Sequence, residues 1–381
     1  MTAPATPQQP PTPDPFQSSP TPLRVGLMGW GGASQVFHAP LIRHTPGLRL
    51  AALSTSRPEE ARAALGPAVD LHPDPAALLA RGDLDLVVIP TPNDTHHPLA
   101  LAALRAGCAV LVDKPFALDE AQARELVAEA ERRGLLLSVF HNRRWDADFL
   151  TARELLRSGA LGTVRHVRMR FDRFRPLVRA RWREGDGPGA GLWMDLGPHL
   201  LDQALQLFGR PQALSADLWV ERPGGVGVDA FSARLRWACG LRVEVAASML
   251  AAQPGPRFEL QGSQGSWIKH GLDAQEDALK AGRFPGDGQP WGVDPLPGRL
   301  LALAPGAAPG AEPVPQAVPT HAGDYPAFYA ALRDAVRGQA PNPVPPGPVL
   351  DVMRLLDLGR QSAREGRELP TGWDAPATMS A

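Results

Sequence analysis

Residues 23–40 decide the fold of this chain, and they read Leu-Arg-Val-Gly-Leu-Met-Gly-Trp-Gly-Gly-Ala-Ser-Gln-Val-Phe-His-Ala-Pro. A short apolar run ends in Gly29, Gly31 and Gly32, and a helix-compatible segment follows from Ser34. This order predicts a strand, a tight turn and a helix, where the glycines let the backbone approach a pyrophosphate and the helix N-terminus binds its charge. A serine stands where the third glycine usually stands, and a plain turn with a helix cap would fit too, so the rest of the chain must decide.

The length and composition favour a two-domain globular protein. The chain has 381 residues, of which 44% are hydrophobic, and a net charge of −1 that gives no reason to expect a nucleic-acid partner. No apolar stretch approaches the roughly 18 residues of a membrane helix, so we expect no membrane span. Residues 1–22 contain eight prolines and no Lys or Arg, which predicts a disordered tail rather than a signal peptide.

Cysteines are too few for a disulfide framework or a metal cluster. Cys108 and Cys239 both lie in apolar neighbourhoods, and we expect two reduced core thiols. The expected compartment is the cytoplasm.

Strand and helix patterns alternate over residues 23–143. Strands are expected at Leu48–Ser54 and over residues 84–90, 109–113 and 135–140, with helical patterns between them. This alternation predicts an α/β Rossmann domain with a doubly wound parallel sheet, whose ligands bind at the carboxyl ends of the strands.

The pattern changes over residues 144–381. Period-two runs are found at residues 164–175, 213–221, 230–237, 241–250 and 257–261, and helical patterns at 149–158, 194–208, 326–337 and 349–365. They predict a C-terminal α+β domain with a large, mostly antiparallel sheet. The segment 303–320, rich in Ala and Pro, is expected to be a loop.

A lysine follows the predicted strand at residues 109–113. The sequence Asp113-Lys114-Pro115 places Lys114 at the carboxyl edge of the sheet, where an ammonium can polarise a carbonyl or alkoxide oxygen and take part in proton transfer. Of the 39 basic residues 36 are arginine, so a lysine hints at a site that requires an ammonium. The alternative is an ordinary surface lysine.

Asp195 and His199 have the spacing i, i+4, which places both side chains on one face of a helix. A His beside a carboxylate is a common arrangement for a base that takes a hydroxyl proton, so we expect Asp195 to orient His199. The same pair could instead serve capping and packing near the helix start. A third ligand and an HExxH pattern are both missing, so we expect no metal.

The end of the second strand indicates the type of dinucleotide. It reads Ser54-Thr55-Ser56-Arg57, with no carboxylate before Glu59. NAD-preferring turns usually offer Asp or Glu to the ribose 2′-hydroxyl, whereas hydroxyls and a guanidinium suit a 2′-phosphate. We therefore expect NADP(H) to be preferred and NAD(H) to be possible, although the serines could simply cap the next helix.

Taken together, these motifs resemble the Gfo/Idh/MocA oxidoreductase family (glucose–fructose oxidoreductase, inositol dehydrogenase and MocA), over nearly all of residues 23–370. The segments that carry the resemblance are Gly29-Trp-Gly, Phe37-His-Ala-Pro40, Pro90-Thr-Pro-Asn-Asp-Thr-His96, Asp113-Lys-Pro115, His141-Asn-Arg-Arg-Trp-Asp146, Phe171-Asp-Arg-Phe-Arg-Pro176, Arg181-Trp-Arg-Glu184 and Asp195–His199. Residues 275–283 and Trp291-Gly292 more narrowly resemble its YdgJ-like and NADP-dependent scyllo-inositol dehydrogenase-like subgroup.

The resemblance implies the site residues. The family's catalytic lysine corresponds to Lys114 and its Asp…His pair to Asp195 and His199. With their neighbours in the same motifs, the expected cofactor-binding residues are Gly29, Trp30, Gly31, Gly32, Ala33, Ser34, Ser54, Ser56, Arg57, Pro90, Thr91, Pro92, Asn93, His96, Asp113, Lys114, Pro115, Asn142, Trp182, Arg183 and Tyr325. Two departures are Asp113, where the family has Glu, and Ser34, which is expected to loosen the packing of helix on strand.

The resemblance also implies a function: NADP(H)-dependent interconversion of a polyol or sugar alcohol and its ketone, with scyllo-inositol as the expected substrate. A homodimer or homotetramer would form through the open face of the C-terminal sheet. Two alternatives are a cofactor-sensing regulator without activity and an NAD-dependent glycosidase on the same fold. Retention of Lys114, Asp195 and His199 disfavours the regulator, and the missing carboxylate after the second strand disfavours the glycosidase.

Overall fold

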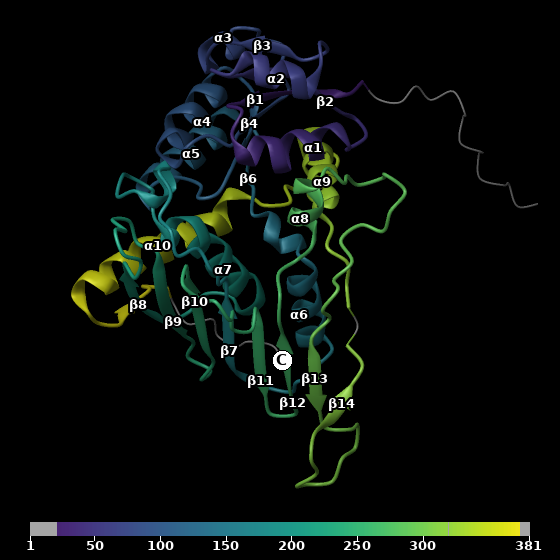
Figure 1. Ribbon diagram of the computed structural model, residues 1–381, viewed down its shortest axis with the longest axis vertical. Coiled ribbons are helices and arrows are strands. Elements are labelled where there is room, and N and C mark those ends of the chain that lie inside the picture. Colours follow the sequence, from purple (N-terminus) through teal and green to yellow (C-terminus); the bar gives the residue numbers. More distant parts are fainter. Residues whose placement is uncertain (1–20, 319, 374–381) are drawn as a thin grey trace, which may run out of the picture.

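The computed structural model describes residues 21–318 and 320–373, and Figure 1 shows two sheets one above the other, each with its own helices. The predicted disordered tail falls outside the described residues, except for Thr21 and Pro22, which precede the first strand.

The first sheet has six parallel strands in the order β3-β2-β1-β4-β5-β6. Its strands are β1 (Leu23–Met28), β2 (Leu48–Ser54), β3 (Asp70–His72), β4 (Leu86–Ile89), β5 (Ala109–Val112) and β6 (Leu137–Val139). The helices of this part are α1 (Ala39–Arg43), α2 (Pro58–Leu65), α3 (Pro75–Leu79), α4 (His96–Arg105) and α5 (Glu120–Arg133). The predicted Rossmann sheet is confirmed, and its strand order reverses between β1 and β4, where such sheets bind dinucleotides.

The glycine turn after β1 is closed by hydrogen bonds. Gly29 has a φ of +85° and its N–H donates to Ser54 O at 2.8 Å. Ser34 begins a π-helical turn (η1, Ser34–His38) that leads into α1. Ser34 is buried and its Oγ donates to Gly29 O at 2.7 Å, so the serine ties the helix start to the turn instead of loosening it.

The second sheet has nine strands in the order β14-β13-β12-β11-β7-β10-β9-β8-β15. Its strands are β7 (Val164–Arg170), β8 (Ala213–Trp219), β9 (Ala230–Arg236), β10 (Arg242–Ser248), β11 (Phe258–Gly262), β12 (Gly265–Lys269), β13 (Arg299–Ala302), β14 (Val314–Gln316) and β15 (Leu369–Pro370). Among the strand pairs within the described residues, the β7–β10 pair alone is parallel, which confirms a mostly antiparallel sheet. The predicted loop at residues 303–320 contains β14, an edge strand where Pro315 is tolerated.

Helices cover one face of this sheet. The helices of this part are α6 (Ala147–Arg157), α7 (Leu192–Phe208), α8 (Gln275–Lys280), α9 (Tyr325–Val336) and α10 (Pro346–Glu365). α7 contacts β9 and β10, and α10 contacts β8, while α9 and α10 also reach back to α1, α5 and β6 of the first part. The opposite face of the sheet carries charged side chains, among them Arg168, which pairs with Glu244 at 3.1 Å and with Glu259 at 3.4 Å.

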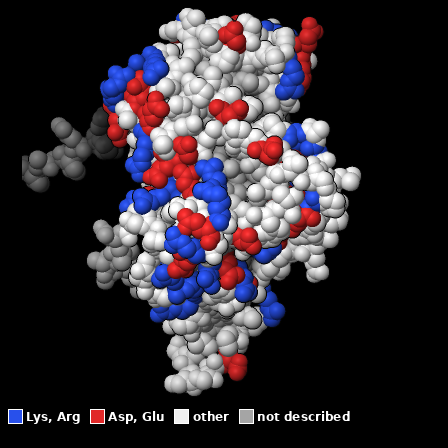
Figure 2. All heavy atoms as spheres, turned by 90° about the vertical axis from the view of Figure 1, so that its left-hand side faces the viewer, with Lys and Arg blue, Asp and Glu red and all other residues white. Residues whose placement is uncertain are grey.

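Surface groups agree with the composition in part. Figure 2 shows basic and acidic side chains intermingled on one side of the molecule, as expected for a chain with little net charge.

Cys108 is buried as predicted, but Cys239 is exposed, because it lies in the turn between β9 and β10. None of the helices in residues 21–318 and 320–373 is both long and apolar enough to cross a membrane.

Candidate active site

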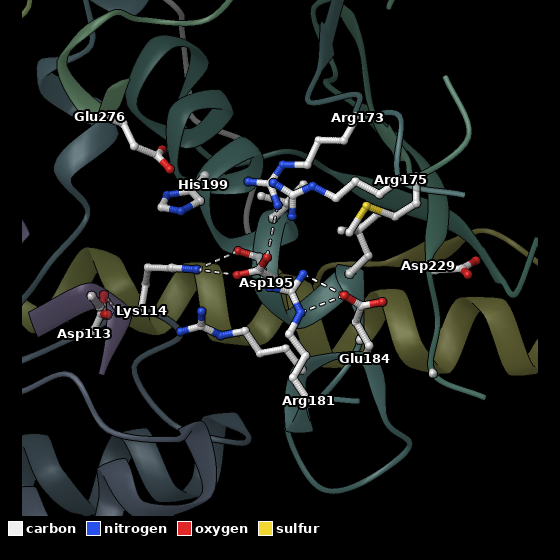
Figure 3. A pocket seen from close by; sticks show the side chains of 18 of the residues that line it. Asp113, Lys114, Arg173, Arg175, Arg181, Glu184, Asp195, His199, Asp229 and Glu276 are labelled. Carbon is white, nitrogen blue, oxygen red and sulfur yellow. Dashed lines mark hydrogen bonds and ion pairs between the residues drawn. The ribbon is translucent and has the colours of Figure 1, made fainter. Parts of the chain in front are cut away.

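A cavity of about 260 Å³ lies where the carboxyl edge of the first sheet meets the second part of the chain (Figure 3). Its wall includes Gly32 from the glycine turn, Lys114 from the end of β5, and Asp195 and His199 from α7. Ala33, Asp113, Asn142 and Arg183 of the predicted set also line it. The structure thus brings together eight predicted residues from distant parts of the chain.

Lys114 and Asp195 form the central ion pair of this cavity. The Lys114 Nζ donates to Asp195 Oδ1 at 2.8 Å and to Asp195 O at 2.9 Å, and Arg173 Nη1 lies 3.7 Å from Asp195 Oδ2. Burial alone would raise the pKa of Asp195, but the charges of Lys114, Arg173 and Arg183 outweigh it and hold that pKa below its usual range. Asp195 is therefore ionised, and it fixes the ammonium at the cavity wall.

His199 lies one turn further along α7, and Figure 3 shows its ring beside the Lys114 ammonium. The expected role of Asp195 as its partner is not what the structure shows, because the described contacts of that carboxylate are with Lys114 and Arg173. The Nδ1 of His199 has no hydrogen-bond partner within the described part of the chain. Burial, and then the charges of Lys114 and Arg143, lower the pKa of His199 well below 6.5. At neutral pH this ring is neutral and can accept a proton.

The glycine turn leaves room for a bound group. Among described atoms, none lies within 4 Å of the point that a Cβ would occupy on Gly31 or Gly32. This open space beside the N-terminal turn of a helix suits a pyrophosphate. Arg57 lies against the same turn, donating from Nη2 to Trp30 O and from Nη1 to Glu60 Oε2 at 2.9 Å.

Four of the predicted cofactor-binding residues outside the cavity wall, His96, Asn93, Trp182 and Tyr325, have surroundings that the sequence did not predict. His96 is fully buried, with Nδ1 2.7 Å from Pro115 O and Nε2 3.0 Å from Thr91 O, so it braces two loops. Asn93 is buried and its Nδ2 donates to Gly189 O at 2.8 Å. Trp182 is 39% exposed, outside the cavity wall.

Tyr325 is fully buried, and its hydroxyl donates to Asp146 Oδ1 at 2.7 Å. Its side chain therefore belongs to the core behind the cavity and is not available to a ligand. The other predicted residues outside the cavity wall lie around the ends of β1, β2, β4 and β5, and they are Gly29, Trp30, Gly31, Ser34, Ser54, Ser56, Arg57, Pro90, Thr91, Pro92 and Pro115.

Several charged lining residues were missed from the sequence. They are Arg173, Arg175, Glu184, Arg222, Asp229, Glu276 and Lys280. Arg143 and Arg181 were not missed, because the basic runs at residues 142–144 and 181–183 favour phosphate or nicotinamide contacts. The motif Phe171–Pro176, already quoted for the resemblance, contains Arg173 and Arg175, so its charge density was an available signal. Arg222 offered none, because its buried pairs with Glu184 at 2.9 Å and Asp229 at 2.8 Å exist only in the folded chain.

The described residues contain no group of three or more His, Cys, Asp or Glu side chains placed to hold a metal ion. A Rossmann sheet joined to a large mixed sheet, with a lysine and a neutral imidazole in the cavity between them, defines a two-domain oxidoreductase. Sequence comparison identifies its family.

The profile of the oxidoreductase family's NAD-binding Rossmann fold matches residues 23–141, and that of its C-terminal alpha/beta domain matches residues 153–371. The chain belongs to the Gfo/Idh/MocA family of oxidoreductases. It is 50% identical over 343 residues to the uncharacterized oxidoreductase YdgJ of Escherichia coli (strain K12), which covers 90% of this chain and 96% of YdgJ. It is 34% identical over 356 residues to IolW of Bacillus subtilis (strain 168), a scyllo-inositol 2-dehydrogenase (NADP(+)), covering 91% and 95% of the two chains.

Solved structures share the whole architecture. The oxidoreductase yvaA from Bacillus subtilis has a TM-score of 0.87 at 32% identity, covering 93% of this chain and 99% of its own. An oxidoreductase from Yersinia pestis has a TM-score of 0.85 at 48% identity, covering 92% and 97%.

Proposed function

We propose that this oxidoreductase is an NADP(H)-dependent dehydrogenase that interconverts a secondary alcohol of a polyol or sugar and the corresponding ketone. The observation that carries the proposal is that Lys114, Asp195 and His199 share one cavity with Gly32 and Ala33 of the glycine turn. The name of IolW, a scyllo-inositol 2-dehydrogenase, supports scyllo-inositol or a related cyclic polyol as substrate.

Each side chain has a role in this proposal. The neutral His199 ring takes the hydroxyl proton, and Lys114 donates hydrogen bonds to the oxygen as it becomes an alkoxide. Asp195 holds the ammonium in place, and its Oδ2, which lies 3.7 Å from Arg173 Nη1, can also accept a hydrogen bond from a neighbouring substrate hydroxyl. The dinucleotide, when bound, supplies the acceptor or donor of the hydride. In ketone reduction the proton moves the other way, from His199 to the oxygen.

The preference for NADP(H) is part of the proposal. The open space beside Gly31 and Gly32 suits the pyrophosphate, and Ser56 and Arg57 are exposed next to the same turn. A guanidinium and a hydroxyl at this position suit a 2′-phosphate, and the name of IolW specifies NADP(+). Glu60 Oε2 accepts a hydrogen bond from Arg57 Nη1 at 2.9 Å and partly neutralises the guanidinium charge. This reduces the advantage of a 2′-phosphate, so NAD(H) can serve as a weaker cofactor.

We also propose that the charged open face of the second sheet joins two or four copies of the chain. A long sheet with one uncovered face offers a broad surface for pairing with a second copy. A cytoplasmic location stays a prediction from the cysteine content.

A panel assay tests the proposed function. Inositols and aldoses are offered with NADP and with NAD to the wild type, to Lys114→Ala and to the control Arg364→Ala, whose side chain is exposed on α10. We expect oxidation of at least one cyclic polyol with NADP, and a loss of about a hundredfold or more in Lys114→Ala. Equal rates for wild type and Lys114→Ala would exclude the role of Lys114, and no turnover with any member of the panel would overturn the function.

A further inference from the structure

A buried histidine outside the cavity links α9 to the end of β5. His38 is 0% exposed, its Nδ1 lies 2.6 Å from the Tyr329 hydroxyl, and its Nε2 lies 3.8 Å from Asp113 Oδ2. Tyr329 is also 0% exposed, and the Phe140 ring packs on the imidazole with centroids 4.5 Å apart. The proposed catalysis assigns no role to His38 or Tyr329.

The contacts of His38 select one tautomer. Burial, and then the charge of Asp113, raise the pKa of Tyr329 well above 10, so its hydroxyl keeps its proton. That hydroxyl donates to Nδ1, which places the ring proton on Nε2, facing Asp113. The opposite tautomer would direct a nitrogen lone pair at a carboxylate, which is repulsive. The distance of 3.8 Å makes this an electrostatic contact rather than a hydrogen bond.

Asp113 connects His38 to the catalytic lysine, because its carboxylate also binds the backbone of Lys114. Its Oδ1 accepts the backbone N–H of Lys114 at 2.7 Å, and its own N–H donates to Ile89 O at 3.1 Å, at the end of β4. Burial would raise the pKa of Asp113, but His38, Lys114 and His96 together lower it to about 2. A fixed anion therefore lies directly before Lys114 in the chain.

We propose that Tyr329 and His38 are positioning residues that hold the Asp113 carboxylate in place, so that Asp113 in turn fixes Lys114 at the cavity wall. The proposal rests on the proposed function, because it explains how that lysine is held. The alternative is that His38 only fills space between Phe140 and Tyr329. The two explanations differ in whether the pKa of Asp113 rises when the imidazole N–H is removed.

The first experiment compares His38→Leu, His38→Gln and Tyr329→Phe with the wild type. We expect His38→Leu to lower kcat about tenfold with the KM for NADP changed little, since the ammonium is misplaced and not the cofactor. Glutamine can direct an amide N–H to the position of Nε2, so His38→Gln is expected to retain more of kcat than His38→Leu. Tyr329→Phe is expected to lower kcat less than His38→Leu does. It removes the hydroxyl that fixes the tautomer of His38 but leaves the imidazole ring in place. His44→Gln, an exposed histidine on the same segment, is the control.

The pH dependence separates positioning from packing. The groups that face Asp113 are His38, Lys114, His96, His141 and Tyr329. Without the imidazole N–H the pKa of Asp113 rises, so its anion is lost at a higher pH. The ratio of wild-type to His38→Leu kcat is therefore expected to grow as the pH falls from 6 toward 4, into the ordinary titration range of a carboxyl group. A constant ratio over this range would overturn the proposal.

The second experiment needs no turnover. The carboxyl ¹³C shift of Asp113 is titrated by NMR in the wild type, His38→Leu and His38→Gln, and thermal melting confirms that each variant folds. We expect Asp113 to titrate at a higher pH in His38→Leu, with His38→Gln between the two. Identical titrations would overturn the proposal even in an active enzyme. A shifted titration in a protein inactive on the whole polyol panel would keep the link to Asp113 and reject only the proposed function.

Discussion

Among residues 21–318 and 320–373, no ion pair joins His199 to an anionic group, and the charges of Lys114, Arg143 and Arg257 act on its ring. The i, i+4 spacing brought Asp195 and His199 to one cavity, as predicted. It could not reveal that Lys114, 81 residues earlier in the chain, takes the carboxylate instead. An ion pair with a lysine is stronger than a contact with a neutral ring, and only the folded chain makes that ammonium available.

The pH dependence of alcohol oxidation follows from this environment. His199 must be neutral to accept the proton, and burial together with Lys114 and Arg143 moves its pKa well below 6.5. The group charges only when the pH falls through this lowered pKa, so the rate is expected to stay level from pH 7.5 down past 6.5. The pH profile of kcat/KM measures the position of this acid limb. A limb at or above pH 6.5 that His199→Asn abolishes would contradict the described environment of the ring.

The three lysines of this arginine-rich chain lie in different surroundings. Lys114 and Lys280 both line the cavity, and Lys280 pairs with Glu276 at 2.6 Å. Lys269 is different, because it is 1% exposed and its Nζ lies 3.3 Å from Asp294 Oδ2 in the core of the second part. The scarcity of lysine therefore hints at a site only for Lys114, since Lys269 lies in the core and the Lys280 side chain is exposed.

At the scale of elements, the loop before α7 joins the two parts of the chain. Gly189 O accepts from Asn93 Nδ2 at 2.8 Å, and Gly189 has a φ of +75°. A Cβ there would lie 2.6 Å from Leu118 Cδ2 and 2.9 Å from Asn93 Cβ. The loop can dock on the first part only because this position has no side chain.

Gly189→Ala is therefore expected to lower the free energy of unfolding by about 1–3 kcal/mol, through backbone strain and these contacts. Urea denaturation measures the change. Gly187→Ala in the same loop is the matched control, since no described atom lies within 4 Å of its Cβ position. We expect that variant to remain within about 0.5 kcal/mol of the wild type. Equal losses in both variants would contradict the docking of the loop through Gly189.

Sequence patterns found the strands of the first sheet, except β3, and missed β12 and β13 of the second sheet. The strands β1, β2 and β5 were predicted because each is an apolar run beside a turn signal. β12, β13 and β3 were missed, because pairing with neighbouring strands decides their structure more than their local sequence does. For the same reason β14 was predicted as loop: it forms only because β13 offers an edge to pair with.

At the scale of the whole molecule, the open face of the nine-stranded sheet is where we expect copies of the chain to meet. Arg168 lies there between Glu244 and Glu259. Sedimentation equilibrium is expected to give two or four times the chain mass of 40.7 kDa. Arg168→Glu places a third carboxylate beside the other two and should shift the protein toward monomer, because like charges repel across the interface. The control Arg364→Glu lies on α10, which covers the other face, and should leave the mass unchanged.

A monomeric wild type, or an assembly that Arg168→Glu leaves intact, would contradict this interface. The resemblance to the family named this face, and local patterns could not, because alternating apolar and polar residues identify an exposed side without saying what covers it. The cavity was likewise beyond local patterns, since its pairs join residues far apart, such as Arg222 and Glu184. The resemblance to the family supplied the catalytic set that spacing by itself left open.

The central claim is that the cavity with Lys114, Asp195 and His199 carries out direct hydride exchange between a polyol carbon and a nicotinamide. It is tested most directly with the carbon-deuterated form of the polyol that reacts fastest in the panel, incubated with NADP and the wild-type protein. The account predicts NADPH that carries one deuterium at C4 of the nicotinamide, as read by mass spectrometry and NMR. NADPH formed without that label would contradict it.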